Sequence, residues 1–487
     1  MRDKGERNSL RPSLAATVAV IAAWGAAAAL LKVRAAQSAA YTSDLYDFHS
    51  ALRSTVDGSF FRSYVYGSVL GDHSYLALLA VLPIYYLDSS RAFWALVVAA
   101  PIVMVCCLIA IRVVGGARHH PFPNLSTFIL LAVPGMFWVM HEPVYGFHPD
   151  TLAAPLLLVA AIGFEGSRSR ERDVGDTLAW IAFVVFLSLK EETALLGIVF
   201  AIPYLVRRQS RRLGIKLVTV SAVATVLGFL TIRFFRTPWN RGNETLIASV
   251  LDKISEPALG DGGSGWTVLV PALASLIVGI GVLAVRRRLS ESDMAIGLVL
   301  SAKILALVLV FPSLPRTSWH LAIPVAAFAY GAYRGTQLLS NIDPRLRPRS
   351  AVGGVLILLI LVYALDGRWY SEYARFLRER TVANEAQLAF DEFSPLVGDG
   401  VVSLPPYDMH AWRDHAAVAV PRGLFESPAG IADSFIAEEG ELPADLTQMM
   451  TCFTPGPSSG PRSVYLRSGD CWYDDERADF DAVVGLP

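Results

Sequence analysis

The stretch SLAATVAVIAAWGAAAALL at residues 13–31 decides the fold class, because it runs for nineteen residues without a charge. A helix that spans a bilayer needs ~20 mostly apolar residues. Comparable apolar blocks follow at Ala92–Ile111, Leu217–Leu230, Val268–Val285, Met294–Phe311 and Ala351–Leu365. They lack the polar face that a surface helix needs. The sequence therefore predicts an α-helical polytopic membrane protein, with its membrane domain at residues 13–366, and not a large soluble helical protein.

The composition and the first apolar block agree with this class. Only 17% of the 487 residues are charged, against about 25% in an ordinary soluble domain. The first block follows a basic leader, which is also typical of a signal peptide. Its apolar run exceeds the usual 7–15 residues of a signal sequence, and Lys32 and Arg34 follow it directly. We interpret it as a retained first span, with cleavage as the alternative.

The charge distribution predicts the orientation. Residues 367–487 hold nine Lys and Arg against twenty Asp and Glu, whereas the rest of the chain holds 33 against 23. Lys and Arg are enriched in cytoplasmic loops. We therefore expect a cytoplasmic N-terminus at residues 1–12 and an extracytoplasmic soluble domain at residues 367–487. The expected location is the cell membrane, crossed many times.

The basic loops divide the apolar blocks into paired crossings, at 178–188 with 193–206, 217–234 with 268–285, and 294–311 with 320–339. Residues 351–365 then carry the chain outward. Two further apolar blocks, 74–87 and 91–111, lie between His73, which we expect at the outer face, and residues 112–120, which we expect at the inner face. An odd number of crossings must therefore lie between those two points. One of the two blocks could be re-entrant or interfacial, or a third crossing could be present. The prediction is about 11–13 spans.

Two outer segments are long enough to fold. Residues 34–72 form the first outer loop, where Leu45, Phe48, Ala51 and Leu52 repeat at helical spacing. This predicts an amphipathic helix lying on the membrane surface. The tail mixes a helical start at 369–390 with strand-like runs at 400–404 and 416–420. It predicts a small α/β domain.

Cys452 and Cys471 both lie in the tail. In an oxidising compartment they could form a disulfide, which would stabilise the fold by about 3 kcal/mol.

Unusual polar residues gather where the predicted topology has its outer face. A charge near the membrane core is costly and therefore suggests function. Surface exposure, helix capping, a structural ion pair or snorkelling would explain each cluster taken singly. Their common side favours a site, because the cytoplasmic loops hold plain Arg and Lys without such pairing. The five clusters are Asp44 with Asp47 and His49, Asp72 with His73, His148 with Asp150, Lys190 with Glu191 and Glu192, and Arg316 with His320.

Four ordered motifs resemble one family of bacterial and archaeal membrane proteins, catalogued as domain of unknown function 2079. The first is SDLYDFHSAL at 43–52, followed by GDHSYL at 71–76 and PIYY at 83–86. The others are YGFHPDTLAAPLLL at 145–158, LKEETALL at 189–196 and RTSWHLAIP at 316–324. They span about residues 40–330, which is most of the membrane part.

The resemblance implies a GT-C-like fold, because that family is grouped with the GT-C glycosyltransferases. Those enzymes take a sugar from a lipid-phosphate donor at the outer membrane face. Their first outer loop carries an acid that serves as base or metal ligand, and Asp44 is the match here. The family often has a second acid five residues on, where this chain has His49.

The implied activity is inverting glycosyl transfer from a polyprenyl-phosphate-linked sugar to an extracytoplasmic acceptor. Asp44 is the candidate catalytic base, and Lys190 and Arg316 are candidates for binding the donor phosphate. Asp47, His49, His73, His148, Asp150, Glu191, Glu192 and His320 could orient substrate or hold a divalent cation, Mg²⁺ or Mn²⁺. The expected partners are the bilayer, the lipid-linked sugar and the acceptor, with no nucleic acid.

Two other classes fit the same residues. Acids, lysines and histidines in a membrane domain can relay protons or bind the substrate of a transporter or flippase. Such proteins commonly show inverted repeats, and no clear internal repeat is present in this sequence. The third interpretation is a non-catalytic envelope assembly protein whose acidic tail binds a partner.

Overall fold

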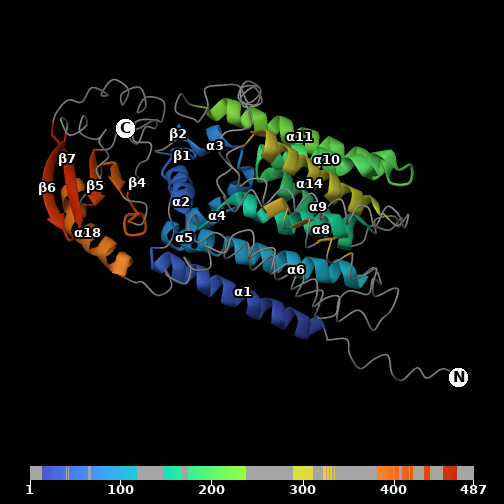
Figure 1. Ribbon diagram of the computed structural model, residues 1–487, viewed down its shortest axis with the longest axis horizontal. Coiled ribbons are helices and arrows are strands. Elements are labelled where there is room, and N and C mark those ends of the chain that lie inside the picture. Colours follow the sequence, from blue (N-terminus) through green and yellow to red (C-terminus); the bar gives the residue numbers. More distant parts are fainter. Residues whose placement is uncertain are drawn as a thin grey trace.

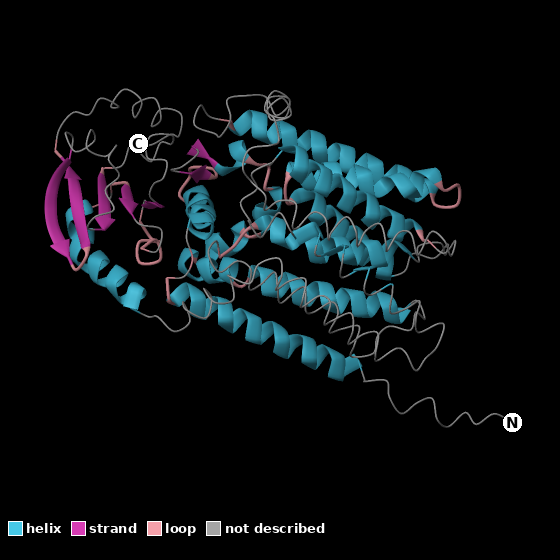
Figure 2. Cartoon of the chain, viewed as in Figure 1, coloured by secondary structure: helices cyan, strands magenta, loops and turns pink. Residues whose placement is uncertain are grey.

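The computed structural model describes residues 14–39, 41, 43–63, 67–117, 146–165, 174–236, 289–310, 322–324, 326, 327, 330, 331, 334, 381–398, 400–404, 408–415, 417–419, 433–438 and 453–468. Over these residues the protein is a bundle of helices with a small sheet at one end (Figures 1 and 2). The long helices are α1 (Leu14–Gln37), α6 (Ala99–Ala117), α8 (Ala153–Glu165), α9 (Val174–Ser188), α10 (Glu191–Val206), α11 (Arg211–Phe235) and α14 (Glu291–Val310).

Two described helices have the length and apolar character to cross a bilayer, Val18–Gln37 within α1 and α11. Helix α11 exposes Val223, Val226, Leu227 and Leu230. A continuous exposed apolar face of this kind suits contact with lipid. The predicted spans 178–188, 193–206 and 294–311 coincide closely with α9, α10 and α14.

The region between residues 74 and 117 does not form two continuous spans. Residues 76–87 form a 3₁₀ helix, η1 (Leu76–Ala80), and the short helix α4 (Leu82–Leu87), which is far from the ~20 residues of a span. The apolar block at 92–111 is divided between α5 (Ser89–Val97) and α6, which are bent by 57°. The two together can form one broken span or a re-entrant loop.

Helix α8 lies at the centre of the bundle. Every residue from Ala153 to Phe164 is buried, as expected for a helix that is apolar on all sides. It packs against α6, α9 and α14, while α10 packs against α11 and α14. This arrangement brings the start of α8 and the start of α10 to the same end of the bundle.

Helix α2 (Ser43–Val56) occupies the first outer loop, as the periodicity predicts. Its apolar residues Leu45, Phe48, Ala51 and Leu52 are all buried against protein, in a core shared with α4 and α5. The expectation that this face lies on the membrane surface is therefore wrong. The spacing shows that one face is buried, but it cannot tell a bilayer from neighbouring helices.

The tail forms a five-stranded sheet in the order β4-β3-β5-β7-β6. Its strands are β3 (Val402–Leu404), β4 (Ala417–Ala419), β5 (Ser434–Glu438), β6 (Phe453–Ser459) and β7 (Arg462–Arg467), and helix α18 (Thr381–Val397) packs against β6 and β7. Strand β3 is parallel to β4 and β5, while β7 is antiparallel to β5 and β6. Both strand-like runs of the tail sequence contain a strand. Cys452 and Cys471 lie outside the described residues.

The tail is joined to the helical bundle through α2 and α5. Met409 and Trp412 belong to the same buried core as Tyr46 and Phe93. The Nη1 atom of Arg53 lies 3.6 Å from Oδ1 of Asp414. Helix α2 is thus enclosed between the bundle and the tail.

Candidate functional site

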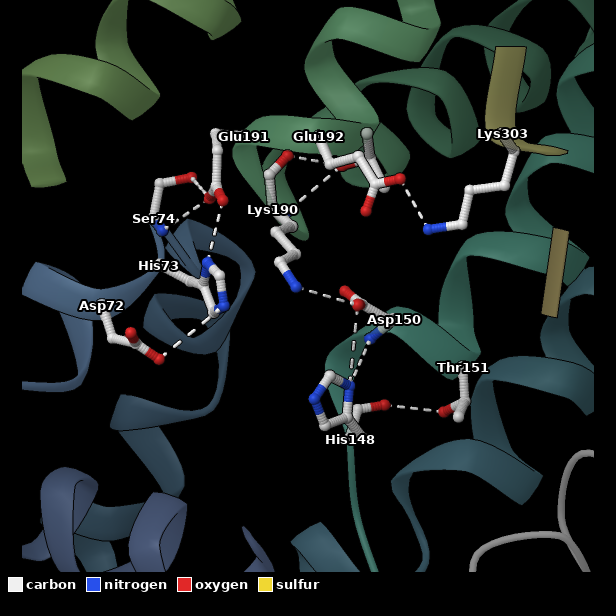
Figure 3. Close-up of polar contacts among 11 residues, drawn as sticks. Asp72, His73, Ser74, His148, Asp150, Thr151, Lys190, Glu191, Glu192 and Lys303 are labelled. Atoms are coloured by element: carbon white, nitrogen blue, oxygen red, sulfur yellow. Dashed lines mark hydrogen bonds and ion pairs between the residues drawn. The ribbon is translucent and has the colours of Figure 1, made fainter. Parts of the chain in front are cut away.

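Three of the motif segments meet at the end of the bundle nearest the tail (Figure 1), and helix α14 adds a lysine to them (Figure 3). The side chains are Asp72 at the end of α3 (Val69–Asp72) with His73 after it, His148 and Asp150 at η2 (Pro149–Leu152), Lys190 with Glu191 and Glu192 at the start of α10, and Lys303 from α14. We call these residues the His148 cluster.

Lys190 lies in the break between α9 and α10. Its backbone is extended, and its N–H donates to Oγ1 of Thr193 over 3.1 Å, which begins α10 at Glu191. The side chain is 9% exposed and points at Asp150, with 3.3 Å between Nζ and Oδ2 (Figure 3). An ammonium group has three donors. Within the described chain, Asp150 is the single acceptor for Nζ.

Asp150 is equally buried, at 9% exposure of its side chain. Burial alone would raise the pKa of this carboxyl, but the Lys190 ammonium beside it holds the pKa well below its usual range. For Lys190, burial lowers the pKa and Asp150 raises it, with a net rise. Among the described residues, the buried Oδ1 atom of Asp150 has no hydrogen-bond partner. A buried acceptor in this state is costly and marks a place where a ligand group could donate.

His148 lies against Asp150, with its Nδ1 accepting from the Asp150 backbone N–H over 3.3 Å. Nδ1 is also 3.9 Å from Oδ2 of the same residue. Burial lowers the pKa of His148 to about 3, against the opposing effect of the Asp150 charge. The imidazole is therefore neutral at physiological pH, and can accept or donate one hydrogen bond.

Glu191 is held by residues that follow α3. Its Oε1 is 2.8 Å from Nδ1 of His73, and its Oε2 accepts from the backbone N–H of Ser74 over 3.2 Å. Burial raises the pKa of Glu191, but the opposing effect of His73 prevails, and the pKa falls to about 2. The Nε2 atom of His73 also lies 3.7 Å from Oδ2 of Asp72. These contacts tie α3 to the start of α10.

Lys303 belongs to the cluster although the sequence analysis did not select it. Its Nζ donates to Oε1 of Glu192 over 2.5 Å, and its side chain is 6% exposed. It comes from the middle of an apolar block that was counted as a span. A single lysine within such a block is itself a signal of function, and that signal could have identified it.

Tyr75 lies beside the cluster and was also missed. Its buried ring lies 5.3 Å from that of His73, and close to His148 as well. Burial raises the pKa of the Tyr75 hydroxyl, and the charges of Asp150, Asp72, Glu191 and Asp44 raise it further. All four carboxylates therefore lie near enough to act on one hydroxyl. Asp44 is half-buried at the start of α2.

His49 and Asp47 are placed differently from Asp44. His49 points toward α4 and α5, with 2.7 Å between its Nδ1 and the Tyr85 hydroxyl and its ring against Phe93. Burial lowers its pKa to about 4. Asp47 is half-buried on α2. Arg316 and His320 lie outside the described residues, so their assigned roles stay predictions.

No group of three or more His, Cys, Asp or Glu could hold a metal ion among the residues that were placed. The carboxylates of the cluster are paired with lysines or histidine, which leaves a poor ligand set for Mg²⁺ or Mn²⁺. The described residues therefore offer no evident site for a divalent cation, and binding of Mg²⁺ or Mn²⁺ stays a prediction.

A second buried set of charges lies at the opposite ends of α8 and α10, and we call it the Asp293 cluster. Arg334 donates from Nε to Oδ1 of Asp293 over 2.7 Å and from Nη2 to Oδ2 over 3.0 Å. Its Nη1 is 2.7 Å from Oε1 of Glu165. Arg207 pairs with Glu291 over 3.3 Å. Basic residues at this end therefore also meet acids, and the sequence does not show which acid each arginine meets. None of these pairs is a histidine–acid pair like those of the His148 cluster.

The family resemblance is confirmed by a comparison with known families. The family described as "Predicted membrane protein (DUF2079)" matches residues 35–253. This range contains the first three of the four motifs. No curated protein matches the chain.

The structure is similar to solved GT-C glycosyltransferases. Over 93% of this chain and 99% of that one, it resembles ArnT from Cupriavidus metallidurans, crystallised with undecaprenyl phosphate, at a TM-score of 0.54 and 14% identity. A second similar structure is the apo oligosaccharyltransferase of Archaeoglobus fulgidus, with a TM-score of 0.48, 11% identity and coverage of 92% of this chain and 74% of that one. The likeness to ArnT shows a GT-C-like fold.

Proposed function

We propose that the protein is a membrane glycosyltransferase of the GT-C type, which moves a sugar from a polyprenyl-phosphate donor to an extracytoplasmic acceptor. The observation that carries the proposal is Lys190, a buried ammonium at the end of the bundle with a single described acceptor. A lipid phosphate would supply the missing acceptors. The structural neighbour ArnT holds undecaprenyl phosphate, which supports a donor of this class.

The proposed reaction follows from the charges at this end of the bundle. Asp44 takes the proton from the acceptor hydroxyl as the new bond to the anomeric carbon forms. The bond from that carbon to the phosphate oxygen breaks, and its electron pair stays on the phosphate. Lys190 stabilises the growing negative charge, with Arg316 as the further proposed cation. The configuration at the anomeric carbon is inverted by this single displacement.

We place this site on the extracytoplasmic side. The sheet of the tail and the His148 cluster lie at the same end of the helices, and α1 begins at the other end (Figure 1). The tail is strongly acidic, while the remainder of the chain is basic. The rule that cytoplasmic loops are basic then assigns the tail and the cluster to the outer face.

The test is donor cleavage by the full chain in nanodiscs. Undecaprenyl-phosphate pentoses and hexoses would be supplied with membrane lipid extract, and release of free undecaprenyl phosphate measured. Asp44→Asn should lower the rate by ~10²–10⁴, the usual contribution of a general base. Asp57→Asn is the matched control, because Asp57 ends the same segment with a 68% exposed side chain. Full activity of Asp44→Asn would refute the base assignment.

A transporter or flippase is the second candidate, because the break between α5 and α6 resembles the broken helices of transporters. The distinguishing assay uses proteoliposomes with a fluorescent polyprenyl phosphate in one leaflet. Movement of the intact lipid between leaflets, without cleavage of any sugar donor, would replace the transferase proposal.

A further inference from the structure

Lys32 is a lysine buried at the end of α1, where the first span meets the outer loop. Its exposed fraction is 1%, and it is surrounded by the core that contains Ala35, Ala36 and Tyr41. Removing an ammonium group from water costs several kcal/mol unless other groups compensate. An apolar residue would fill this position more cheaply, so the contacts of the charge itself require an explanation.

The ammonium of Lys32 connects the end of α1 to the residues just before α2 and to residue 146, which is 114 positions away. Its Nζ donates to the carbonyl of Gly146 over 2.5 Å. It also lies 5.4 Å from the centre of the Tyr41 ring, a distance typical of a cation–π contact. Tyr41 directly precedes α2, and Gly146 precedes His148 and Asp150 by only a few residues.

Gly146 shows how closely these segments are packed. Its φ of +73° is a conformation that favours glycine. A Cβ at this position would lie 2.7 Å from Cγ of Tyr41 and 3.0 Å from a methyl carbon of Leu45. The backbone at residue 146 is therefore pressed directly against the first turn of α2, which carries Asp44.

The following residues continue the same contact. The ring of Phe147 lies 5.7 Å from that of Phe48, and the ring of His148 lies 6.2 Å from it. Phe48 is one helical turn after Asp44 on α2. The segment 146–148 thus runs along the face of α2 that bears Asp44, and it leads directly to Asp150, the ion-pair partner of Lys190.

We propose that Lys32 is a positioning residue of the transfer site, fastening residue 146 to the first span and thereby fixing the separation of Asp44 from Asp150 and Lys190. The inference rests on the proposed function for its catalytic consequence. The reaction requires the base and the phosphate-binding cation on opposite sides of one anomeric carbon. A misplacement of about 1 Å can reduce a rate by 10².

The experiment compares Lys32→Met, which keeps the length of the side chain, with Arg34→Met, which removes an exposed cation two residues further along α1. Hydrogen–deuterium exchange of the full chain in nanodiscs reports on the segment without reference to activity. Lys32→Met should raise exchange of the peptide covering 146–152 at least fivefold. It should also lower kcat by about 10–100-fold with little change in KM for the donor.

Two further variants separate positioning from a general loss of stability. Gly146→Ala disturbs the same contact from the other side while retaining the lysine, and should raise exchange in the same peptide. In an Asp44→Asn background, Lys32→Met should cause almost no further loss of kcat, because the base that it positions is gone. A multiplicative loss in the double variant would overturn the positioning role.

The outcomes distinguish this inference from the proposed function. Wild-type exchange in both Lys32→Met and Gly146→Ala would overturn the inference, whether or not the protein is a transferase. If no sugar donor is cleaved by the wild type, the proposed function fails. Raised exchange confined to 146–152 would in that case still support Lys32 as the fastener of this segment.

Discussion

The two ends of α10 carry buried charges that are satisfied to different degrees. In the Asp293 cluster, a planar guanidinium makes two hydrogen bonds to Asp293 and lies beside Glu165, and the Tyr330 hydroxyl donates to Asp293 over 3.1 Å. In the His148 cluster, the cations are lysines, and Oδ1 of Asp150 has no hydrogen-bond partner in the part of the chain that the structure describes.

This difference teaches which buried charges to interpret as a site. Location at the end of a helix is insufficient, because both clusters occupy such ends. Paired carboxylates and a forked arginine form a closed ion pair that connects helices. An ammonium with spare donors beside an orphaned acceptor leaves hydrogen bonds for a ligand to complete. The degree of satisfaction, rather than the presence of charge, identifies the His148 cluster as the candidate site.

The largest expected effect tests whether the ion pairs of the Asp293 cluster hold the helices together. Arg334→Met leaves Asp293 and Glu165 buried without their cation, and breaking a buried pair costs about 3–5 kcal/mol. Chemical denaturation of the detergent-solubilised protein measures the free energy of unfolding. The rate of donor cleavage per folded molecule should be close to wild type. A variant as stable as wild type would show that this cluster does not hold the helices.

Lys190→Met should have the opposite profile. Loss of a group that stabilises charge in the transition state lowers the rate of donor cleavage by ~10²–10³. Some stability is lost too, because Asp150 remains charged. The double variant Lys190→Met with Asp150→Asn removes both charges, and should recover most of the stability but none of the activity. Recovery of activity in the double variant would contradict a role for Lys190 in catalysis.

A smaller effect is expected in the pH dependence of the free energy of unfolding, and it comes from His148. The pKa of folded His148 is near 3 and its ordinary value is 6.5. As the pH falls below 6.5, the unfolded chain gains this proton while the folded protein does not, so the free energy of unfolding decreases. Between pH 6.5 and 5 the decrease is about 2 kcal/mol for this residue, at ~1.4 kcal/mol per unit.

His148→Gln should remove that part of the acid sensitivity. Denaturation curves of wild type and variant at pH 7, 6 and 5 provide the measurement. Asp150 and Glu191 do not contribute in this range, since both are ionised above pH 5 in folded and unfolded chains. An unchanged slope in His148→Gln would show that His148 takes up its proton while folded.

The smallest effect is expected at the exposed contact between α2 and the tail. Arg53 is 36% exposed and its partner Asp414 is 50% exposed. Exposed pairs of this kind contribute ~0.2–1 kcal/mol. Arg53→Ala should therefore change the free energy of unfolding by less than about 1 kcal/mol in the same assay. A loss of stability as large as that of Arg334→Met would show that this contact holds the tail on α2 as strongly as the Asp293 cluster holds the helices.

The sequence predicted the helical class and the residues that begin the site. Long apolar blocks specify helices directly, and α9, α10 and α14 lie close to the predicted spans. The motifs at 71–76, 145–158 and 189–196 meet in space. Patterns of this kind depend on residues that are close together in the sequence, so they can be recognised without a structure.

The partners of buried charges were not predictable in the same way. Lys303 meets Glu192 across 111 positions, and Arg334 meets Asp293 across 41. Neither pair follows a helical or strand period. The bend between α5 and α6 was missed, because residues 92–111 are uncharged and resemble one continuous span. The cap at Asp88, which accepts from the Arg91 N–H, marks where α5 begins. Pro101, just after the bend, is the local signal that could have located it, since a proline cannot donate to the carbonyl four residues earlier.

The enclosure of α2 between the bundle and the tail has a consequence for how the protein is made. Arg53 contacts Asp414 across 361 positions of sequence, so α2 must wait for almost the whole chain to be synthesised and translocated. Contacts of such high sequence separation form late and slowly. Until then Tyr46 of α2 lacks its contact with His410 of the tail. A prematurely terminated chain would insert its first helices normally and still present an incomplete outer surface, which is a feature that membrane quality control can recognise.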